Sequence, residues 1–307
     1  MMNSIPLITV GLTCYNAQDT IIRAIESAQQ QDWANIEVVV VDDCSEDSSI
    51  ALLEEARIKF DNLRIIRHDQ NKGYPSALNS IIDNAKGTYI AFFDDDDDSD
   101  PARLTKQMRR LNEYELKHQN CPLLCYTDRR VFVDGQEKPE AYVNAIGNKP
   151  EEPHGEVVAD YILWHSRDKR YIWGEFGSCT LLAHKNTLKS FLFDPEFRRC
   201  AEWDLAVRIA RAGGHFIAVN EPLVIQHKTP TSDKAGKKPL KYNLMLREKH
   251  KMFLKSKNVY WGAVLLAHSR FSYFRNKKWK SRLYLALACI CAPHLILKEE
   301  LIRRFVK

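Results

Sequence analysis

Short apolar runs alternate along residues 1–100 with longer segments in which apolar side chains recur every three or four positions. The runs are rich in Val and Ile and predict strands at residues 7–14, 36–41, 63–67 and 89–93. The segments between them predict amphipathic helices at residues 21–30, around Leu53 and at 74–85. Strands that alternate with helices of this length build right-handed βαβ units. We therefore expect an α/β fold with a mostly parallel central sheet flanked by helices.

The pattern is less regular after residue 100, where a helix is predicted at residues 101–118. Short apolar runs predict strands at residues 123–126, 129–133, 176–182, 215–219 and 222–226, and residues 141–153 are typical of an irregular loop. A further amphipathic helix opens at Ala201-Glu202-Trp203-Asp204 and is ended by Gly213-Gly214. The second part of the fold is therefore expected to mix helices with short strands.

An acidic run, D-D-D-D-D-S-D, follows the strand at residues 89–93 directly. Carboxylates this close repel one another, and a shared divalent cation removes that repulsion. Oxygen ligands suit Mg²⁺ or Mn²⁺, and such ions commonly carry the phosphates of a substrate. Most acidic runs are solvated loops, but this one lies at the carboxyl edge of the predicted sheet, where open α/β sheets bind ligands. The position favours a metal site.

Polar residues also follow the first two strands, as T-C-Y-N at residues 13–16 and as Asp42-Asp43. The carboxyl ends of parallel strands lie side by side, so both segments are expected to meet the acidic run at one crevice. There Tyr15 could stack on a nucleotide base and Asp43 could bind a base or ribose. The alternative is that Tyr15 packs and Asp43 caps the following helix. The chain has neither G-x-G-x-x-G nor G-x-x-x-x-G-K-[ST], which argues against dinucleotide-binding and P-loop sites.

Charge divides the chain into two parts. Residues 228–307 contain 20 Lys and Arg against 4 Asp and Glu, a balance of +16, whereas the whole chain carries +5; residues 1–227 therefore carry −11. Aromatic residues interleaved with Lys and Arg in this basic tail favour an anionic membrane surface as partner. The alternative is a helical hairpin packed on the body. No nucleic-acid-binding motif accompanies the basic residues, so no nucleic acid partner is expected.

Cellular location is predicted from what the sequence lacks. The eight cysteines form no C-x-x-C pair, which favours reduced thiols. The N-terminal residues do not have the pattern of a secretory signal peptide. The longest apolar stretch, residues 283–297, is shorter than the roughly 20 residues that span a bilayer. We expect a cytoplasmic protein that lies peripherally on the inner face of the cell membrane.

Four blocks carry a resemblance to a known family: V-G-L-T-C-Y-N at residues 10–16, V-V-V-V-D-D-C-S at 38–45, N-K-G-Y-P-S-A-L-N at 71–79 and G-T-Y-I-A-F-F-D-D-D-D-D-S-D-P-A-R-L at 87–104. In their order and spacing the chain resembles family 2 glycosyltransferases with the GT-A fold. The resemblance implies a GT-A catalytic domain at residues 1–227, with a nucleotide-binding half at 1–100 and an acceptor half at 101–227. Residues 228–307 would form a basic helical C-terminal extension.

The resemblance also implies a donor site. Thr13, Tyr15 and Asp43 would hold the nucleotide base, usually uracil, and Asn16 lies in the same block. By the same resemblance the donor would be a nucleotide-diphospho-sugar, most often linked to UDP.

The acidic run takes the place of the family's D-x-D motif. Asp96 would then be the direct ligand of Mn²⁺ or Mg²⁺, while Asp94 and Asp95 would serve the ribose and the water shell of the metal. His227 follows the last predicted strand and is a further candidate ligand of the metal or of phosphate. A lone exposed histidine is the alternative.

Sugar transfer with inversion needs a carboxylate that accepts the proton of the attacking hydroxyl. The family usually has Glu-Asp-x-Asp at this point, with the second acid as base, whereas this chain has Ala201-Glu202-Trp203-Asp204. Glu202 therefore occupies the position of the base; the alternative is an acid that favours the start of a helix. Asp204 would support the helix or bind the acceptor. Trp203 would stack on a sugar or pack in the core.

These inferences together predict an inverting, metal-dependent, hexosyltransferase-type glycosyltransferase. Its acceptor would be a glycan or a lipid-linked saccharide in the synthesis of cell-surface polysaccharide. The alternative is a catalytically inactive protein of the same fold that binds nucleotide-sugars or acts as a membrane scaffold, because Ala201 replaces the usual acid. A nucleotidyltransferase is disfavoured because residues 11–17 lack a glycine-rich loop with Lys or Arg.

Overall fold

A computed structural model describes residues 5–133, 138–149, 151–228 and 238–293. The chain forms two compact units. The first comprises Met1–Gly155 and Arg170–Thr229, and the second comprises Glu156–Lys169 and Pro230–Lys307. A short internal segment thus belongs to the same unit as the basic tail. The functional domains assigned to residues 1–227 and 228–307 stay a prediction.

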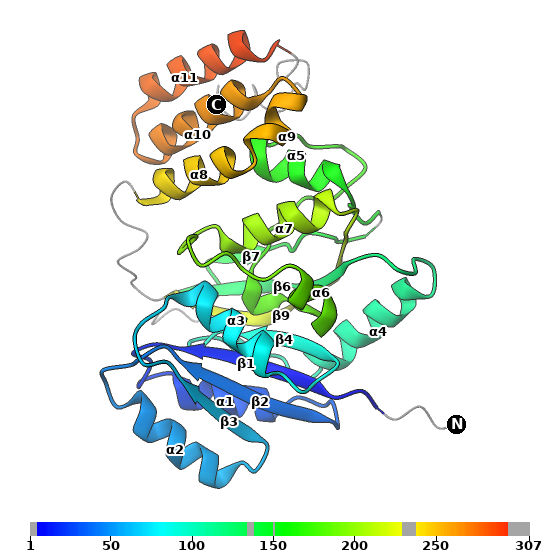
Figure 1. Cartoon of the computed structure of the whole chain (residues 1–307), viewed down its shortest axis with the longest axis vertical. Coiled ribbons are helices and arrows are strands. Elements are labelled where there is room, and N and C mark those ends of the chain that lie inside the picture. Colours follow the sequence, from blue (N-terminus) through cyan, green and yellow to red (C-terminus); the bar gives the residue numbers. More distant parts are fainter. Residues whose placement is uncertain (1–4, 134–137, 150, 229–237, 294–307) are drawn as a thin grey trace. The chain divides into compact units, whose positions relative to one another are not determined.

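A mixed sheet forms the centre of the first unit (Figure 1). Its strands within the described residues are β1 (Ile8–Cys14), β2 (Ile36–Asp42), β3 (Leu63–Arg67), β4 (Tyr89–Phe93), β5 (Asp98–Ser99), β6 (Leu123–Val133), β7 (Ala141–Val143), β8 (Leu182–His184) and β9 (His215–Lys228). The order is β3-β2-β1-β4-β8-β6-β9-β5, and β7 pairs with β6. Strands β3, β2, β1 and β4 are mutually parallel, whereas β8 is antiparallel to both of its neighbours. The α/β class is therefore confirmed, with a parallel first half and a mixed second half.

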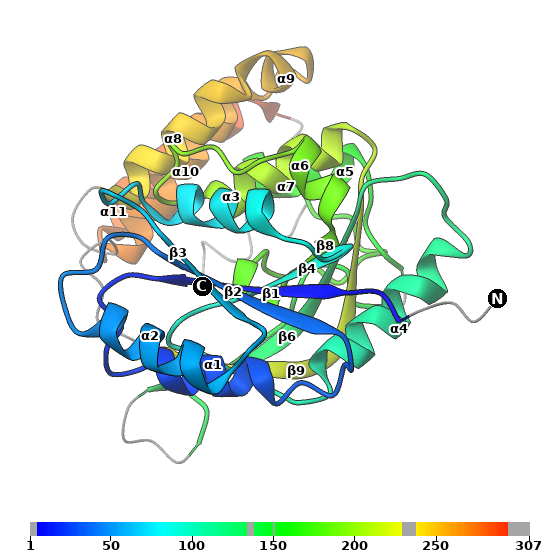
Figure 2. The same ribbon diagram turned by 60° about the horizontal axis from the view of Figure 1, so that its bottom comes forward.

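Helices cover both faces of this sheet (Figure 2). They are α1 (Ile21–Gln29), α2 (Ser49–Lys59), α3 (Tyr74–Asn84), α4 (Arg103–Glu115), α6 (Lys185–Ser190) and α7 (Ala201–Arg211). Apolar residues of α1, α2 and α4 form one buried cluster with the alternate β1 residues Ile8, Val10 and Leu12. The opposite face of β1 carries Gly11, and a Cβ atom there would lie 2.3 Å from Cγ2 of Ile81 in α3. Close packing of α3 on the sheet therefore depends on a missing side chain.

Several boundaries in the second part of the sheet differ from those expected. The strands predicted at residues 123–126 and 129–133 are one strand, β6, and those at 215–219 and 222–226 are one strand, β9. These strands pair in parallel, with register shifts on either side of Asp128. The strand predicted at residues 176–182 is wrong, because Ser178–Thr180 forms a 3₁₀ turn before β8. Part of the predicted loop after residue 140 forms β7.

The described part of the second unit is helical. Its helices are α5 (Glu156–Trp164), α8 (Lys238–Lys249), α9 (Lys251–Ser256), α10 (Tyr260–Phe274) and α11 (Lys278–Cys291). Helix α10 contacts each of the other four, and Lys257 forms ion pairs with Glu156 and Asp160 of α5 at 3.0 Å each. The predicted helical extension is confirmed, and α8 is separated from α9 at His250. None of the described helices is both long and apolar enough to cross a bilayer.

Candidate functional site

The ends of β1, β2 and β4 meet at one edge of the sheet, as their parallel pairing requires. The backbone N–H of Tyr15, after β1, donates to Oδ2 of Asp95, after β4, at 3.2 Å. The backbone N–H of Asp43, after β2, donates to the carbonyl of Cys14 at 2.8 Å. Segments far apart in the sequence are thus hydrogen-bonded at the crevice that the sequence predicts.

Asp43 is buried and organises the loop that leads into α3. Its carboxylate accepts hydrogen bonds from the backbone N–H groups of Lys72 and Gly73, at 2.8 and 2.7 Å, and lies 2.6 Å from Nδ1 of His68. Gly73 has φ +89°, a left-handed conformation that suits glycine. The carboxylate therefore fixes the block at residues 71–79 against β2. Direct binding of a nucleotide base by Asp43 stays a prediction.

The loop after β1 presents an aromatic ring to solvent. Tyr15 is 47 % exposed, so the alternative that it packs in the core is wrong, and its ring is free to stack. Thr13 behind it is buried. Asn16 has φ +51° and joins two loops: its N–H donates to Oγ of Ser45, and its Oδ1 accepts from the N–H of Glu46. Asn16 thus positions the loop around Tyr15.

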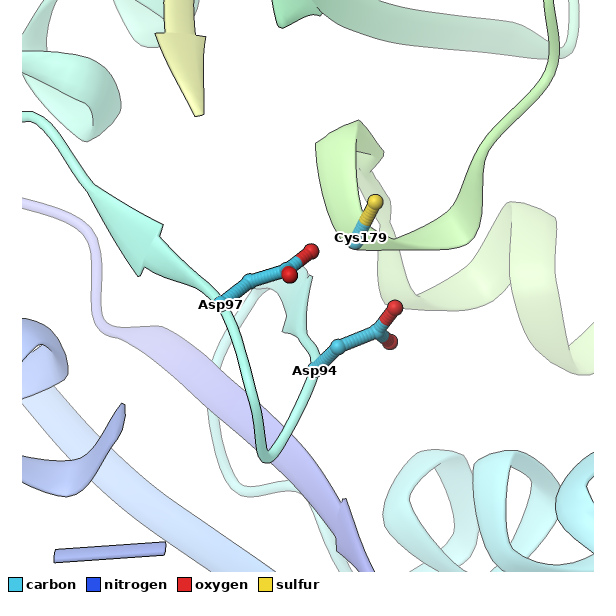
Figure 3. Close-up of side chains that lie close together, drawn as sticks. All are labelled: Asp94, Asp97 and Cys179. Atoms are coloured by element: carbon cyan, nitrogen blue, oxygen red, sulfur yellow. The ribbon is translucent and has the colours of Figure 1, made fainter. Parts of the chain in front are cut away.

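Two carboxylates and a thiol converge beyond β4. Asp94, Asp97 and Cys179 each present a ligand atom within 4.8 Å of the others, and their side chains point toward one another (Figure 3). Oδ1 of Asp97 accepts from the backbone N–H of His227 at 3.1 Å. Oδ2 of Asp97 is buried without a hydrogen-bond partner in the part of the chain that the structure describes. A buried, unpaired carboxylate oxygen is costly, and a bound cation or a shared proton would remove that cost.

Electrostatics in the acidic run agree with this interpretation. Burial raises the pKa of Asp94 and Asp97 above the ordinary range, and the charges of neighbouring aspartates raise both pKa values further. The pKa of Asp95 is raised to about 8, first by burial and then by Asp96. Ionised carboxylates at these positions therefore repel one another at neutral pH, which is the condition that cation binding relieves.

Two of the three side chains in this cluster suit Mg²⁺ or Mn²⁺. The carboxylates of Asp94 and Asp97 are hard oxygen ligands and fit either ion. Cys179 fits less well, because burial followed by the charge of Asp94 raises the pKa of the thiol well above its usual value. A protonated thiol is a poor ligand for a hard cation.

The other predicted ligands lie beside this trio. The backbone carbonyl of Asp96 accepts a hydrogen bond from Arg23, and Nε2 of His227 lies 2.9 Å from Oδ2 of Asp98. His227 is therefore paired with a carboxylate. Metal ligation by Asp96 and by His227 stays a prediction.

A chain of three short contacts links the acidic run to the candidate base. The hydroxyl of Tyr74 donates to Oδ1 of Asp94 at 3.0 Å, the hydroxyls of Tyr74 and Ser178 lie 2.6 Å apart, and Ser178 donates to Oε1 of Glu202 at 3.1 Å. Two hydroxyls supply only two protons for three contacts. All three contacts can therefore be hydrogen bonds only when Asp94 or Glu202 carries a proton.

The first turn of α7 holds three predicted site residues, which differ in burial and in contacts. Glu202 is half-buried, and burial raises its pKa above the ordinary value. Asp204 is fully buried and accepts from Nε of Arg208 at 2.8 Å. Trp203 is half-buried. The ion pair of Asp204 with Arg208 favours support of the helix over acceptor binding, and Glu202 is joined to the hydroxyl chain.

A family model matches the first part of the chain. The model of glycosyl transferase family 2 matches residues 9–127. Over this region the chain is similar to members of glycosyl transferase family 2. The matched region contains Tyr15, the buried Asp43 and the whole acidic run, so the family's motifs lie at the sheet edge where β1, β2 and β4 end.

Curated relatives match different shares of the chain. The succinoglycan biosynthesis protein ExoO of Rhizobium meliloti (strain 1021) is 43 % identical over 109 residues, which cover 36 % of this chain and 31 % of ExoO. The amylovoran biosynthesis glycosyltransferase AmsB of Erwinia amylovora is 23 % identical over 255 residues, 82 % of this chain and 80 % of AmsB. The chain thus spans under a third of ExoO and most of AmsB.

A solved structure extends the likeness of fold. The crystal structure of S. aureus TarS 1-349 in complex with UDP-GlcNAc has a TM-score of 0.65 and 18 % sequence identity, covering 92 % of this chain and 79 % of that one. The chain described here therefore has the GT-A fold.

The sequence did not single out three of the residues that line this site. Tyr74 lies inside the block at residues 71–79, whereas Ser178 and Cys179 lie in a small-residue segment that was expected to be a strand. Tyr74 and Ser178 are separated by 104 positions, so only the fold brings them together. The small-residue composition of G-S-C-T at residues 177–180 was the one signal of a close approach there.

Proposed function

We propose that this chain is an inverting, metal-dependent glycosyltransferase of the hexosyltransferase type that uses a nucleotide-diphospho-sugar, UDP-linked, as donor. One observation carries the proposal: in a family 2 fold, Glu202 is joined through Ser178 and Tyr74 to Asp94 of the acidic run. The candidate base of the acceptor half and the candidate metal site of the donor half are thus parts of one arrangement. A protein that only binds nucleotide-sugars would not need a hydrogen-bonded link between a base and a metal site.

In the proposed reaction the acceptor hydroxyl attacks the anomeric carbon of the donor sugar. The bond from that carbon to the diphosphate oxygen breaks, and Glu202 accepts the hydroxyl proton. The proton on Glu202 supplies the third hydrogen that the Asp94–Tyr74–Ser178–Glu202 contacts lack, with Ser178 and Tyr74 each turning to donate toward Asp94. Protonated Glu202 therefore keeps Ser178 as a hydrogen-bond partner, and all three contacts are then hydrogen bonds.

Asp94 and Asp97, with Asp96, would hold Mn²⁺ or Mg²⁺ beside the diphosphate. When bound, such an ion supplies positive charge that offsets the negative charge developing on the leaving group. The exposed ring of Tyr15 would stack on the base, with Thr13 beneath it and with Asn16 and Asp43 holding the surrounding loops. Asp95 fixes the backbone of Tyr15 to the acidic run.

The donor and acceptor classes are inferred from relatives. TarS was crystallised with UDP-GlcNAc, and ExoO and AmsB are described as biosynthesis proteins of succinoglycan and amylovoran. We infer a UDP-sugar donor and a glycan or lipid-linked saccharide acceptor in cell-surface polysaccharide synthesis. The basic second unit supports a cytoplasmic site of action at an anionic membrane surface.

Nucleotide release tests the proposal. The purified chain is incubated with Mn²⁺ and a panel of nucleotide-sugars, and release of the nucleoside diphosphate is followed with and without saccharide acceptors. Release from a UDP-sugar that requires the cation is expected. Saturable binding with no turnover on any acceptor would instead support the inactive binding protein that Ala201 leaves open.

Ser178→Ala is expected to lower the rate of transfer by about tenfold, because Glu202 loses the hydroxyl that orients it and that connects it to Tyr74. The Michaelis constant for the donor should change little. Ser178→Thr, which keeps a hydroxyl, should recover most of the rate. A purely structural role would be indicated if both variants lost rate and thermal stability equally.

A further inference from the structure

Helix α11 carries an exposed apolar row on the side opposite to its packed side. Trp279, Leu283, Leu287 and Ile290 are 67 %, 50 %, 39 % and 74 % exposed. At 3.6 residues per turn these four positions fall within an arc of about 80°. They therefore form one continuous stripe along the helix rather than scattered exposed residues.

Contacts of the same helix identify its packed side. Ser281 and Ala288 are buried, and the hydroxyl of Ser269 in α10 donates to the backbone carbonyl of Ser281 at 2.8 Å. The rings of Tyr284 and His268 of α10 stack at 5.1 Å. Ser281 and Ala288 lie about 140–160° from the centre of the apolar stripe on the helical wheel. Packing against α10 thus leaves the stripe facing outward.

Basic residues border the stripe on both sides. On the wheel, Lys280 falls just beyond Leu287, whereas Arg282 and Lys278 fall beyond Trp279 on the other edge, and all three are exposed. In residues 238–293 the sequence has one acidic residue, Glu248 in α8. An apolar stripe with cations at its margins is the pattern of a helix that lies in the plane of a membrane interface.

We propose that α11 is the membrane-docking helix of this chain, with the Trp279–Ile290 stripe inserted among the acyl chains of an anionic lipid surface and its flanking cations at the headgroups. An anionic lipid surface is favoured over a second copy of the chain as the partner, because two such cationic faces would repel each other. Nucleic acid is disfavoured, because its phosphates would bind the cations and leave the apolar stripe exposed to water. The proposal rests on the membrane part of the proposed function and is independent of its chemistry.

Vesicle binding by an uncharged double variant tests the stripe. Leu283→Ser/Leu287→Ser removes apolar surface without changing charge and should lower partitioning onto phosphatidylcholine–phosphatidylglycerol vesicles by about tenfold or more. Ile58→Ser/Leu116→Ser, at two exposed apolar positions of the first unit, is the matched control and should bind like the parent. Lys278→Gln/Lys280→Gln/Arg282→Gln should lower binding to the same vesicles roughly a hundredfold.

Fluorescence gives a second measurement that needs no loss of binding. Brominated lipids should quench the parent chain more than Trp279→Phe, because the parent places one additional indole in the acyl region. Undiminished vesicle binding by Leu283→Ser/Leu287→Ser, or equal quenching of the two chains, would overturn the proposal. So would a dimer of the parent that this double variant converts to a monomer. Nucleotide release measured without vesicles reports on the chemistry separately, so failure of either proposal can be recognised.

Discussion

Glu202→Gln is expected to lower the rate of sugar transfer by about two to four orders of magnitude, while the affinity for the nucleotide-sugar stays unchanged. Glutamine keeps the shape of the side chain and an oxygen that can accept from Ser178, but it cannot take the acceptor proton. The step that fails is therefore deprotonation of the attacking hydroxyl. Single-turnover transfer and calorimetric titration with the donor measure the two quantities independently.

The pH dependence of the rate supplies a further readout. Burial raises the pKa of Glu202, so the rate of the parent should rise with pH to a plateau as this carboxyl ionises, with a midpoint above the ordinary glutamate value. Ser178→Ala should move that midpoint further upward, because ionised Glu202 loses the hydrogen bond that Ser178 donates to it. The residual rate of Glu202→Gln should lack this rise.

Glu196→Gln is the matched control, since Glu196 is an exposed glutamate six positions before Glu202. It should transfer sugar at the parental rate. Parental transfer by Glu202→Gln would reject Glu202 as the base. Loss of donor affinity equal to the loss of rate would instead assign Glu202 to donor binding.

The elements of residues 1–100 were predictable because their sequence signals are local. Each strand is an apolar run between helices of regular periodicity, and the predicted bounds of β1 to β4 differ from the observed ones by at most one residue at each end. The convergence of Tyr15, Asp43 and the acidic run follows from parallel pairing alone. No long-range knowledge was needed for this part of the site.

The acceptor half was harder to predict because its strands are determined by partners far away in the sequence. Asp128 and the Asn220-Glu221-Pro222 segment have the composition of strand breakers, yet β6 and β9 continue through them with a shifted register. The hydroxyl chain was also hard to predict, because it joins α3 to a 3₁₀ turn and to α7, which are far apart in the sequence. Glu202 could be chosen by resemblance, but its link to Asp94 required the fold.

Asp94→Asn is expected to lower transfer by about two to three orders of magnitude and to abolish stabilisation by Mn²⁺ in the presence of UDP. The amide keeps the size of the side chain but is a weaker ligand for a hard cation. For the parent, Mn²⁺ with UDP should raise the melting temperature, because a ligand that binds only the folded state stabilises it. Thermal unfolding with and without the cation measures this difference.

The same variant should behave in the opposite way without cation. The pKa of Asp95 is raised from 3.8 to about 8 in the folded chain, and Asp94 contributes to that rise. A carboxyl whose folded pKa is raised holds its proton longer in the folded state, so stability is lost as the pH rises from 3.8 to about 8. Removing the charge of Asp94 should make this loss smaller.

At pH 8 without cation, Asp94→Asn should therefore melt above the parent, whereas with Mn²⁺ and UDP it should melt below. Asp61→Asn, at an exposed turn before β3, should follow the parent in both conditions. Retained Mn²⁺ stabilisation with parental transfer would remove Asp94 from the metal site and leave Asp96 as the predicted ligand. Lower stability of Asp94→Asn in every condition would show that the contact with Tyr74 outweighs the repulsion. If the order of the two melting temperatures reverses between these conditions, the acidic run destabilises the fold until it binds a cation. That behaviour is expected of a metal site.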